Sequence, residues 1–216
     1  MRSHFTRAGM PAMLMLFAAL AGGVASASAQ STHKGKRKPM KQEKVVAVIE
    51  TTLGTIEAEL YPADAPKTVE NFVGLTGKKY FDGVIFHRVV PGFVIQGGDP
   101  TGTGTGGASI WGKDFADELN PATPSYKAGY TKGVLAMANR GPNTNTSQFF
   151  IMLADNTTLP KNYTIFGKVV KGIEVVDAIG STALTGGMGP DASKPATPVV
   201  MKKVWLREAP APAKKD

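Results

Sequence analysis

The sequence predicts a mainly β fold, a closed antiparallel barrel of eight strands capped by two short α-helices. Eight short apolar runs of β type are separated by glycine-rich loops, and only two segments show helical periodicity. Because strands and helices do not alternate along the chain, a doubly wound parallel sheet is excluded. The 216 residues, 42% hydrophobic and 19% charged, suit one soluble domain or at most two small ones.

The first two strands are expected at the start of the folded domain, which we place at residues 45–207. Residues 45–49 form a continuous apolar run. Residues 55–60 alternate strictly, with apolar side chains on one face and Glu57 and Glu59 on the other. The two segments therefore predict a hairpin with one face in the core.

Two helices and six more strands complete the expected domain. The first helix is expected to begin at Pro66, because proline in the first turn loses no intrahelical hydrogen bond. Val69 and Phe72 lie on its apolar stripe, and Gly77 ends it. The second helix is expected over residues 173–179. The remaining strands are expected at residues 84–89, 93–96, 133–138, 147–153, 164–170 and 199–206.

Residues 1–29 have the three parts of a secretory signal peptide. Two arginines make the start positive, residues 10–20 are apolar, and residues 27–29 (Ala-Ser-Ala) form a cleavage site of small residues. We expect cleavage after Ala29, a periplasmic protein of bacterial type, and no stable membrane insertion after the signal is removed. An uncleaved N-terminal anchor is the alternative.

Two polar segments flank the predicted domain. Residues 30–44 carry six lysines and arginines against one glutamate, with Gly35 and Pro39 opposing regular structure. We expect a disordered basic linker, with a tether to anionic lipid or nucleic acid as the alternative. Because export removes most contact with nucleic acid, we expect no nucleic-acid partner. Residues 208–216, rich in alanine and proline, are expected to form a disordered tail.

Reactive side chains are scarce. The absence of cysteine excludes disulfides, thiolate nucleophiles and cysteine-ligated zinc. Of three histidines, only His87 lies in the predicted domain. A histidine-rich metal site or a pair of acid–base histidines therefore cannot be built, and we expect no metal and no cofactor. His87 should point away from its neighbour Arg88 on an alternating strand, as a structural histidine.

Residues 102–107 (Gly-Thr-Gly-Thr-Gly-Gly) contain the G-x-G-x-x-G pattern of dinucleotide-binding sites. That pattern requires a strand before it and a helix after it. Residues 109–112 (Ser-Ile-Trp-Gly) do not open a helix. A loop whose backbone closely approaches a ligand is the better interpretation.

Two longer blocks are far more specific. Residues 86–99 read FHRVVPGFVIQGGD, and residues 137–151 read MANRGPNTNTSQFFI. In this order they resemble the cyclophilin family of peptidyl-prolyl cis-trans isomerases, and the resemblance extends over residues 45–206. It implies a cyclophilin-like barrel, an enzyme of class EC 5.2.1.8, proline-containing polypeptides as substrates, and no cofactor. We expect a monomer.

The implied reaction needs little from the side chains. Turning an X–Pro bond breaks amide resonance, with a barrier of about 18–20 kcal/mol. The twisted state has a prolyl nitrogen with a free lone pair, so a donor that reaches it stabilises the transition state more than the planar ground state. Arg88 matches the family's catalytic arginine and would be this donor, because a guanidinium stays protonated. A surface arginine in a salt bridge is the alternative.

The resemblance also assigns the substrate-binding residues. Phe93 and Phe150 would line the proline pocket with Val94 and Leu159, and plain core is the alternative for these four.

Polar groups would hold the peptide backbone. Gln96 would bind the peptide carbonyl or support the catalytic arginine. Asn139, helped by Ala138, would pair with the residue before the proline, while Gln148 would contact the carbonyl side. Two residues of the glycine-rich loop would flank the neighbouring subsite. The predicted substrate-binding residues are Phe93, Val94, Gln96, Gly104, Thr105, Ala138, Asn139, Gln148, Phe150, Leu159 and Tyr163.

Two positions depart from the best-known eukaryotic pattern of the family. The family's tryptophan falls on Thr158 and its histidine on Tyr163. Tyr163 still supplies an aromatic wall and a hydroxyl. Thr158 lacks the indole donor that helps to hold the inhibitor cyclosporin, so we expect weak or no cyclosporin binding. Trp111 and Trp205 do not align with the missing indole.

The predicted function is thus a prolyl isomerase that accelerates X–Pro isomerisation in the folding of exported proteins. A proline-peptide-binding chaperone or scaffold with incidental turnover is the alternative. The intact set of Arg88, Phe93 and Gln96 favours the enzyme.

Overall fold

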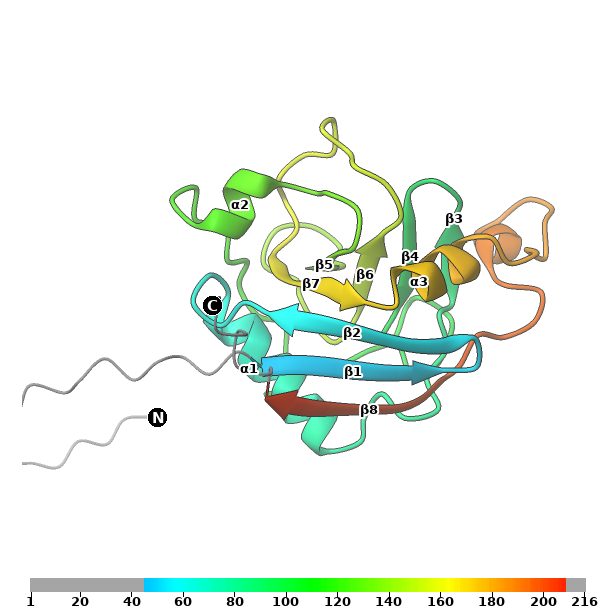
Figure 1. The fold of residues 1–216 in the computed structure, drawn as a ribbon, viewed down its shortest axis with the longest axis horizontal. Helices are drawn as coiled ribbons and strands as arrows, with labels where there is room; N and C mark the ends of the chain where they lie inside the picture. Colours follow the sequence, from blue (N-terminus) through cyan, green and yellow to red (C-terminus); the bar gives the residue numbers. More distant parts are fainter. Residues whose placement is uncertain (1–44, 209–216) are drawn as a thin grey trace, which may run out of the picture. The chain divides into compact units, whose positions relative to one another are not determined.

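The computed structural model describes residues 45–208. The predicted signal peptide (1–29) and basic linker (30–44) lie outside the described residues, as does the predicted tail beyond Glu208. The described residues form eight strands, three α-helices and one 3₁₀ helix (Figure 1).

The eight strands pair in one antiparallel sheet in the order β3-β4-β6-β5-β7-β2-β1-β8. Each strand overlaps one of the predicted apolar runs, so the mainly β antiparallel fold is confirmed. Figure 1 shows β2, β1 and β8 side by side. The strands are β1 (Val45–Thr51), β2 (Gly54–Leu60), β3 (Arg88–Val90), β4 (Val94–Gly97), β5 (Val134–Met137), β6 (Phe149–Met152), β7 (Ile165–Lys171) and β8 (Met201–Glu208).

The prediction of two helices was wrong in number. The helices α1 (Pro66–Gly77) and α3 (Ile173–Gly180) lie where the periodicity predicted them. A third helix, α2 (Pro124–Ala128), has only five residues, so it is too short to show an apolar stripe in the sequence. The 3₁₀ helix spans Pro190–Ser193.

The closed barrel is not confirmed, because β3 and β8 stand at the two ends of the strand order. The segments that precede these strands approach each other at one place, where Ile85 and Val200 form an isolated bridge. There the Gly83 amide donates to the Met201 carbonyl at 2.8 Å, and the Met201 amide donates to the Val84 carbonyl at 2.8 Å. The sheet is therefore a curled half-barrel whose ends touch over a few residues.

The strand β6 is buried on both faces, which divides the apolar core in two. Its Phe149 and Ile151 pack in the larger cluster, against α1 and the β1–β2 hairpin. Its Phe150 and Met152 point to the opposite face, as alternation along a strand requires, and pack in a smaller cluster with Tyr130. The smaller cluster supports the face of the sheet that carries the predicted site residues.

Candidate active site

Three predicted site residues form a row across neighbouring strands. Arg88 on β3 stands opposite Gln96 on β4, and Gln96 stands opposite Phe150 on β6. Register partners in adjacent strands are about 5 Å apart and project to the same face of the sheet. The Arg88 guanidinium donates through Nη1 to Gln96 Oε1 at 3.2 Å. The sheet register thus places a fixed cation beside a buried aromatic ring.

A cavity of about 240 Å³ opens on this row. It is slightly smaller than the usual small-ligand pocket of about 300–1,000 Å³, so it suits a side chain of a peptide better than a cofactor. Its lining combines five apolar side chains and a tyrosine ring with one guanidinium and two amides. Nine of the twelve predicted site residues line it: Arg88, Phe93, Val94, Gln96, Ala138, Asn139, Phe150, Leu159 and Tyr163.

The other three predicted residues lie beside the cavity. The side chain of Gln148 is buried and engaged at both ends of its amide. Its Oε1 accepts from Gln96 Nε2 at 2.9 Å, and its Nε2 donates to the carbonyls of Gly104 (3.0 Å) and Gly106 (2.7 Å). Thr105 is exposed on the same loop, with its hydroxyl 2.8 Å from that of Thr103. Gln148 therefore connects the glycine-rich loop to Gln96, the middle residue of the row formed by Arg88, Gln96 and Phe150.

Asn139 uses its side chain to hold two loops together. Its Nδ2 donates to the Asn162 carbonyl at 2.9 Å, and its Oδ1 accepts from the Gly141 amide at 3.3 Å. These bonds use one of the two Nδ2 hydrogens and one of the two Oδ1 lone pairs, and they hold the amide at the edge of the cavity.

Tyr163 forms an aromatic wall of the cavity, and Tyr130 fixes it from behind. The rings of Tyr163 and Phe150 meet edge to face, with centroids 5.5 Å apart. The Tyr130 hydroxyl donates to the Tyr163 carbonyl and accepts from the Tyr163 amide, both at 3.0 Å. Burial raises the pKa of Tyr130 to about 12. Sequence reasoning missed Tyr130, because the only signal is that a buried tyrosine hydroxyl needs a partner.

Asp99 is a second residue whose importance the sequence did not reveal. Its carboxylate is fully buried and accepts hydrogen bonds from the amides of Thr101 (2.8 Å), Gly104 (2.7 Å) and Gly106 (3.1 Å). Burial by itself raises the pKa of Asp99, but the hydrogen bonds from Thr101, Gly106 and Gly104 outweigh burial and hold the pKa below its ordinary value. The carboxylate therefore remains charged inside the loop.

His87 lies under that loop rather than in the cavity. It is buried, and neither ring nitrogen has a hydrogen-bond partner among residues 45–208. A Cβ added to Gly104 would lie 3.4 Å from His87 Cδ2, so the ring lies close to the loop. Burial lowers the pKa of His87; Asp99 opposes this, and Arg88 adds to it. The ring is thus a neutral packing element, which agrees with a structural role.

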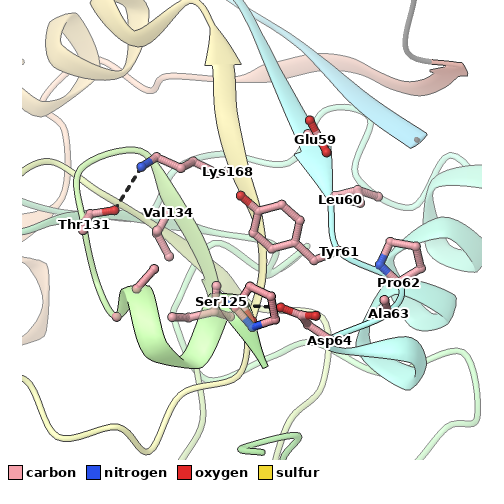
Figure 2. A pocket seen from close by; sticks show the side chains of 14 residues that line it. Glu59, Leu60, Tyr61, Pro62, Ala63, Asp64, Ser125, Thr131, Val134 and Lys168 are labelled. Carbon is pink, nitrogen blue, oxygen red and sulfur yellow. Dashed lines mark hydrogen bonds between the residues drawn. The ribbon is translucent and has the colours of Figure 1, made fainter. Parts of the chain in front are cut away.

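A larger groove, of about 500 Å³, lies between the end of β2 and α2 (Figure 2). Tyr61, Asp64 and Lys168 surround it, and none of the predicted site residues line it. Two of its charged side chains make hydrogen bonds within the protein: Asp64 accepts from the Ser125 amide at 2.8 Å, and Lys168 donates to Thr131 at 3.0 Å. Pocket size alone therefore does not single out the predicted site, whose residues line the smaller cavity.

Among residues 45–208, no group of three His, Asp or Glu side chains could hold a metal ion. In the same range no helix is long and apolar enough to cross a membrane.

Known proteins match most of this chain. The family described as "Cyclophilin type peptidyl-prolyl cis-trans isomerase/CLD" matches residues 46–205. The chain is 54% identical over 132 residues to "Peptidyl-prolyl cis-trans isomerase ppi1" of Schizosaccharomyces pombe, which covers 61% of this chain and 83% of that protein. A crystal structure of a cyclophilin type peptidyl-prolyl cis-trans isomerase of Cryptosporidium parvum superposes with a TM-score of 0.70 at 36% identity, covering 77% of this chain and 99% of that one. A second structure of that protein, determined in the presence of the dipeptide Ala-Pro, gives a TM-score of 0.68, again at 36% identity, and covers 76% of this chain and 99% of that one.

Proposed function

The chain belongs to the cyclophilin-type peptidyl-prolyl cis-trans isomerases, and on this premise we propose that Arg88 drives X–Pro isomerisation in exported polypeptides. The isomerase activity follows from the family. The role of each residue and the export of the protein are the new elements of the proposal.

The uncatalysed reaction is slow because the peptide C–N bond must lose its double-bond character. The barrier is about 18–20 kcal/mol, and exchange takes on the order of 10–100 s. In the twisted state the prolyl nitrogen becomes pyramidal and its lone pair can accept a hydrogen bond. A donor held at that position stabilises the twisted state selectively.

The setting of Arg88 is the observation that supports the proposal that this residue is the donor. Its guanidinium is fixed by Gln96 at 3.2 Å and faces a cavity lined by Phe93 and Phe150. The apolar lining would receive the proline ring. The partly enclosed site strengthens a charge-assisted hydrogen bond relative to bulk water. The X–Pro bond would rotate without any covalent bond being formed or broken, so Arg88 does not have to give up a proton.

The direct test is cis-trans exchange of an Ala-Pro peptide, measured with the wild type and with Arg88→Ala. We expect clear acceleration by the wild type and a large loss in the variant, with peptide binding retained through the apolar lining. Equal acceleration by the two proteins would contradict the assignment of Arg88. Binding without acceleration by the wild type would instead indicate a peptide-binding scaffold.

Export is supported by residues 1–29, whose positive start, apolar stretch and small-residue cleavage site form a signal-peptide pattern. The relatives named above are eukaryotic proteins and do not bear on export. Expression in a bacterium followed by fractionation tests it. We expect a periplasmic protein whose mass corresponds to a first residue Gln30, and a full-length protein in the cytoplasm would refute export.

Weak cyclosporin binding and a monomeric state also belong to the proposal. The exposed Thr158 takes the position of the family's tryptophan, and its amide and hydroxyl both donate to Asn156 Oδ1 at 3.0 Å. An inhibition titration and sedimentation measure the two properties.

A further inference from the structure

The glycine-rich loop at residues 101–106 encloses an anion that belongs to the protein itself. Asp99 is fully buried, and a buried carboxylate is costly unless hydrogen bonds replace its water. Three backbone amides of the loop point at it, those of Thr101, Gly104 and Gly106, together with the Thr101 hydroxyl at 2.8 Å. The loop is thus a nest of N–H groups of the kind that elsewhere binds phosphate.

The glycines of the loop are required by this arrangement. Gly102 and Gly104 have φ of +65° and +83°, which lets the backbone curl around the carboxylate. A Cβ on Gly106 would lie 2.4 Å from Asp99 Oδ1, so any side chain there displaces the anion. The nucleotide-like glycine pattern in the sequence therefore serves an internal carboxylate.

The outer side of the same loop sets the direction of Gln148. The carbonyls of Gly104 and Gly106 both accept from Gln148 Nε2, at 3.0 and 2.7 Å. If the amide flipped, its oxygen would face two carbonyl oxygens, so the flipped orientation is excluded. The loop thereby fixes which end of Gln148 faces Gln96.

The orientation of the Gln148 amide in turn determines which atom of Gln96 faces the catalytic arginine. With its oxygen facing Gln96, Gln148 accepts from Gln96 Nε2 at 2.9 Å. Gln96 must then present Oε1 to Arg88, and Arg88 Nη1 donates to it at 3.2 Å. If either amide were reversed, Arg88 would face an NH₂ group instead of an acceptor.

We propose that Asp99 is a positioning residue for isomerisation, acting on Arg88 through the 101–106 loop, Gln148 and Gln96. The proposal rests on the proposed function, in which Arg88 is the donor. Asp99 itself does not touch the substrate.

The test uses Asp99→Asn, which keeps the size of the side chain but turns an NH₂ group toward backbone donors. We expect kcat/KM for the Ala-Pro peptide to fall about tenfold, because a misplaced catalytic group loses rate. The loss should appear in kcat, with KM unchanged within about twofold, since the apolar lining is intact. A change that appears only in KM, or no change in either constant, would overturn the proposal.

A matched control and a double variant separate positioning from plain stability. Asp64→Asn makes the same change of charge at a carboxylate that also accepts from a backbone amide, that of Ser125, and should leave the rate unchanged. Gln96→Leu removes the last member of the relay before Arg88. If Asp99 acts through Gln96, Asp99→Asn should cost nothing further in the Gln96→Leu background, whereas multiplied losses would refute the relay.

If Asp99→Asn does not fold, Gly106→Ala provides the same test, because its Cβ displaces the carboxylate. A folded Gly106→Ala protein with wild-type kcat would refute the proposal. Arg88→Ala is measured in the same series. If Arg88→Ala keeps the wild-type rate, the proposed function fails; if only the Asp99 and Gly106 variants keep it, the positioning proposal alone fails.

Discussion

Tyr130→Phe tests whether the aromatic wall of the cavity is held from behind. The substitution removes one oxygen and keeps the ring, which packs against Tyr163 with centroids 6.2 Å apart. Two hydrogen bonds are lost, both of 3.0 Å and both to the Tyr163 backbone. The perturbation is therefore confined to the support of the wall.

The expected loss of stability follows from those two hydrogen bonds. Each is worth about 1 kcal/mol net, so the free energy of unfolding should fall by about 2 kcal/mol. For a protein of this size that corresponds to a Tm about 4–8 °C lower. We also expect kcat/KM to fall by about two- to fivefold, because Tyr163 is less well positioned.

The pH dependence gives an independent signature. Burial raises the pKa of Tyr130 to about 12 in the folded protein, against about 10 in an unfolded chain. A raised folded pKa contributes stability that is fully present below about pH 10 and is lost as the pH rises toward 12. The difference in Tm between wild type and Tyr130→Phe should therefore shrink above about pH 10.

Thermal unfolding monitored by circular dichroism measures both effects. The control is Tyr126→Phe, which makes the same chemical change on α2, where the ring instead contacts the Lys161 ammonium at 4.5 Å. Equal shifts in Tm for the two variants, or a Tyr130→Phe shift below about 1 °C, would refute the reasoning.

Three further outcomes are expected. In steady-state kinetics, Phe93→Ala should raise KM for the Ala-Pro peptide about ten- to hundredfold, because apolar contact is lost, and should change kcat little. An unchanged KM would show that the proline ring binds elsewhere. At pH values below about 6.5 the Tm of the wild type should decrease, because burial lowers the pKa of His87 in the folded protein while the histidine of the unfolded chain takes up a proton. His87→Leu should lack this decrease in Tm at low pH. An equal decrease in both proteins would assign the effect to other groups. Gly98→Ala should lower the free energy of unfolding by about 2–4 kcal/mol in denaturant titration, because its Cβ would lie 2.3 Å from the Ser147 carbonyl at a φ of +88°. The control is Gly83→Ala, whose φ is +82° and whose Cβ would have nothing within 4 Å, and it should lower the free energy of unfolding by only about 1–2 kcal/mol.

Much of the fold could be predicted because its signals are local. Alternation in residues 55–60 and the apolar stripe of α1 each report a face that the core covers. The helix α2 left no such signal, since five residues do not complete two turns. The predicted closure of the barrel is not confirmed, and the sequence could not decide it, because the two ends of the sheet meet only through backbone pairing between segments more than a hundred residues apart.

For the candidate site, too, part could be predicted from the sequence and part could not. The family resemblance indicated which residues gather, and nine of the twelve line one cavity. It suggested that Gln96 could support Arg88, as the hydrogen bond between them shows, but it did not indicate how the other residues connect. The orientation of Gln148 depends on carbonyls more than forty residues earlier, and those depend on Asp99. Such polar connections have no periodicity in the chain, so only the folded arrangement reveals them.

We propose that Arg88 acts as an oriented donor and not merely as a positive charge. Arg88→Lys keeps the charge but loses the planar fork that Gln96 holds at 3.2 Å. The decisive measurement is the rate of cis-trans exchange of an Ala-Pro peptide at equilibrium, followed by NMR with wild type and Arg88→Lys at equal occupancy. We predict an exchange rate lower by about a hundredfold in the variant, the usual effect of losing one transition-state donor. An Arg88→Lys enzyme that exchanges the peptide as fast as the wild type would contradict the claim.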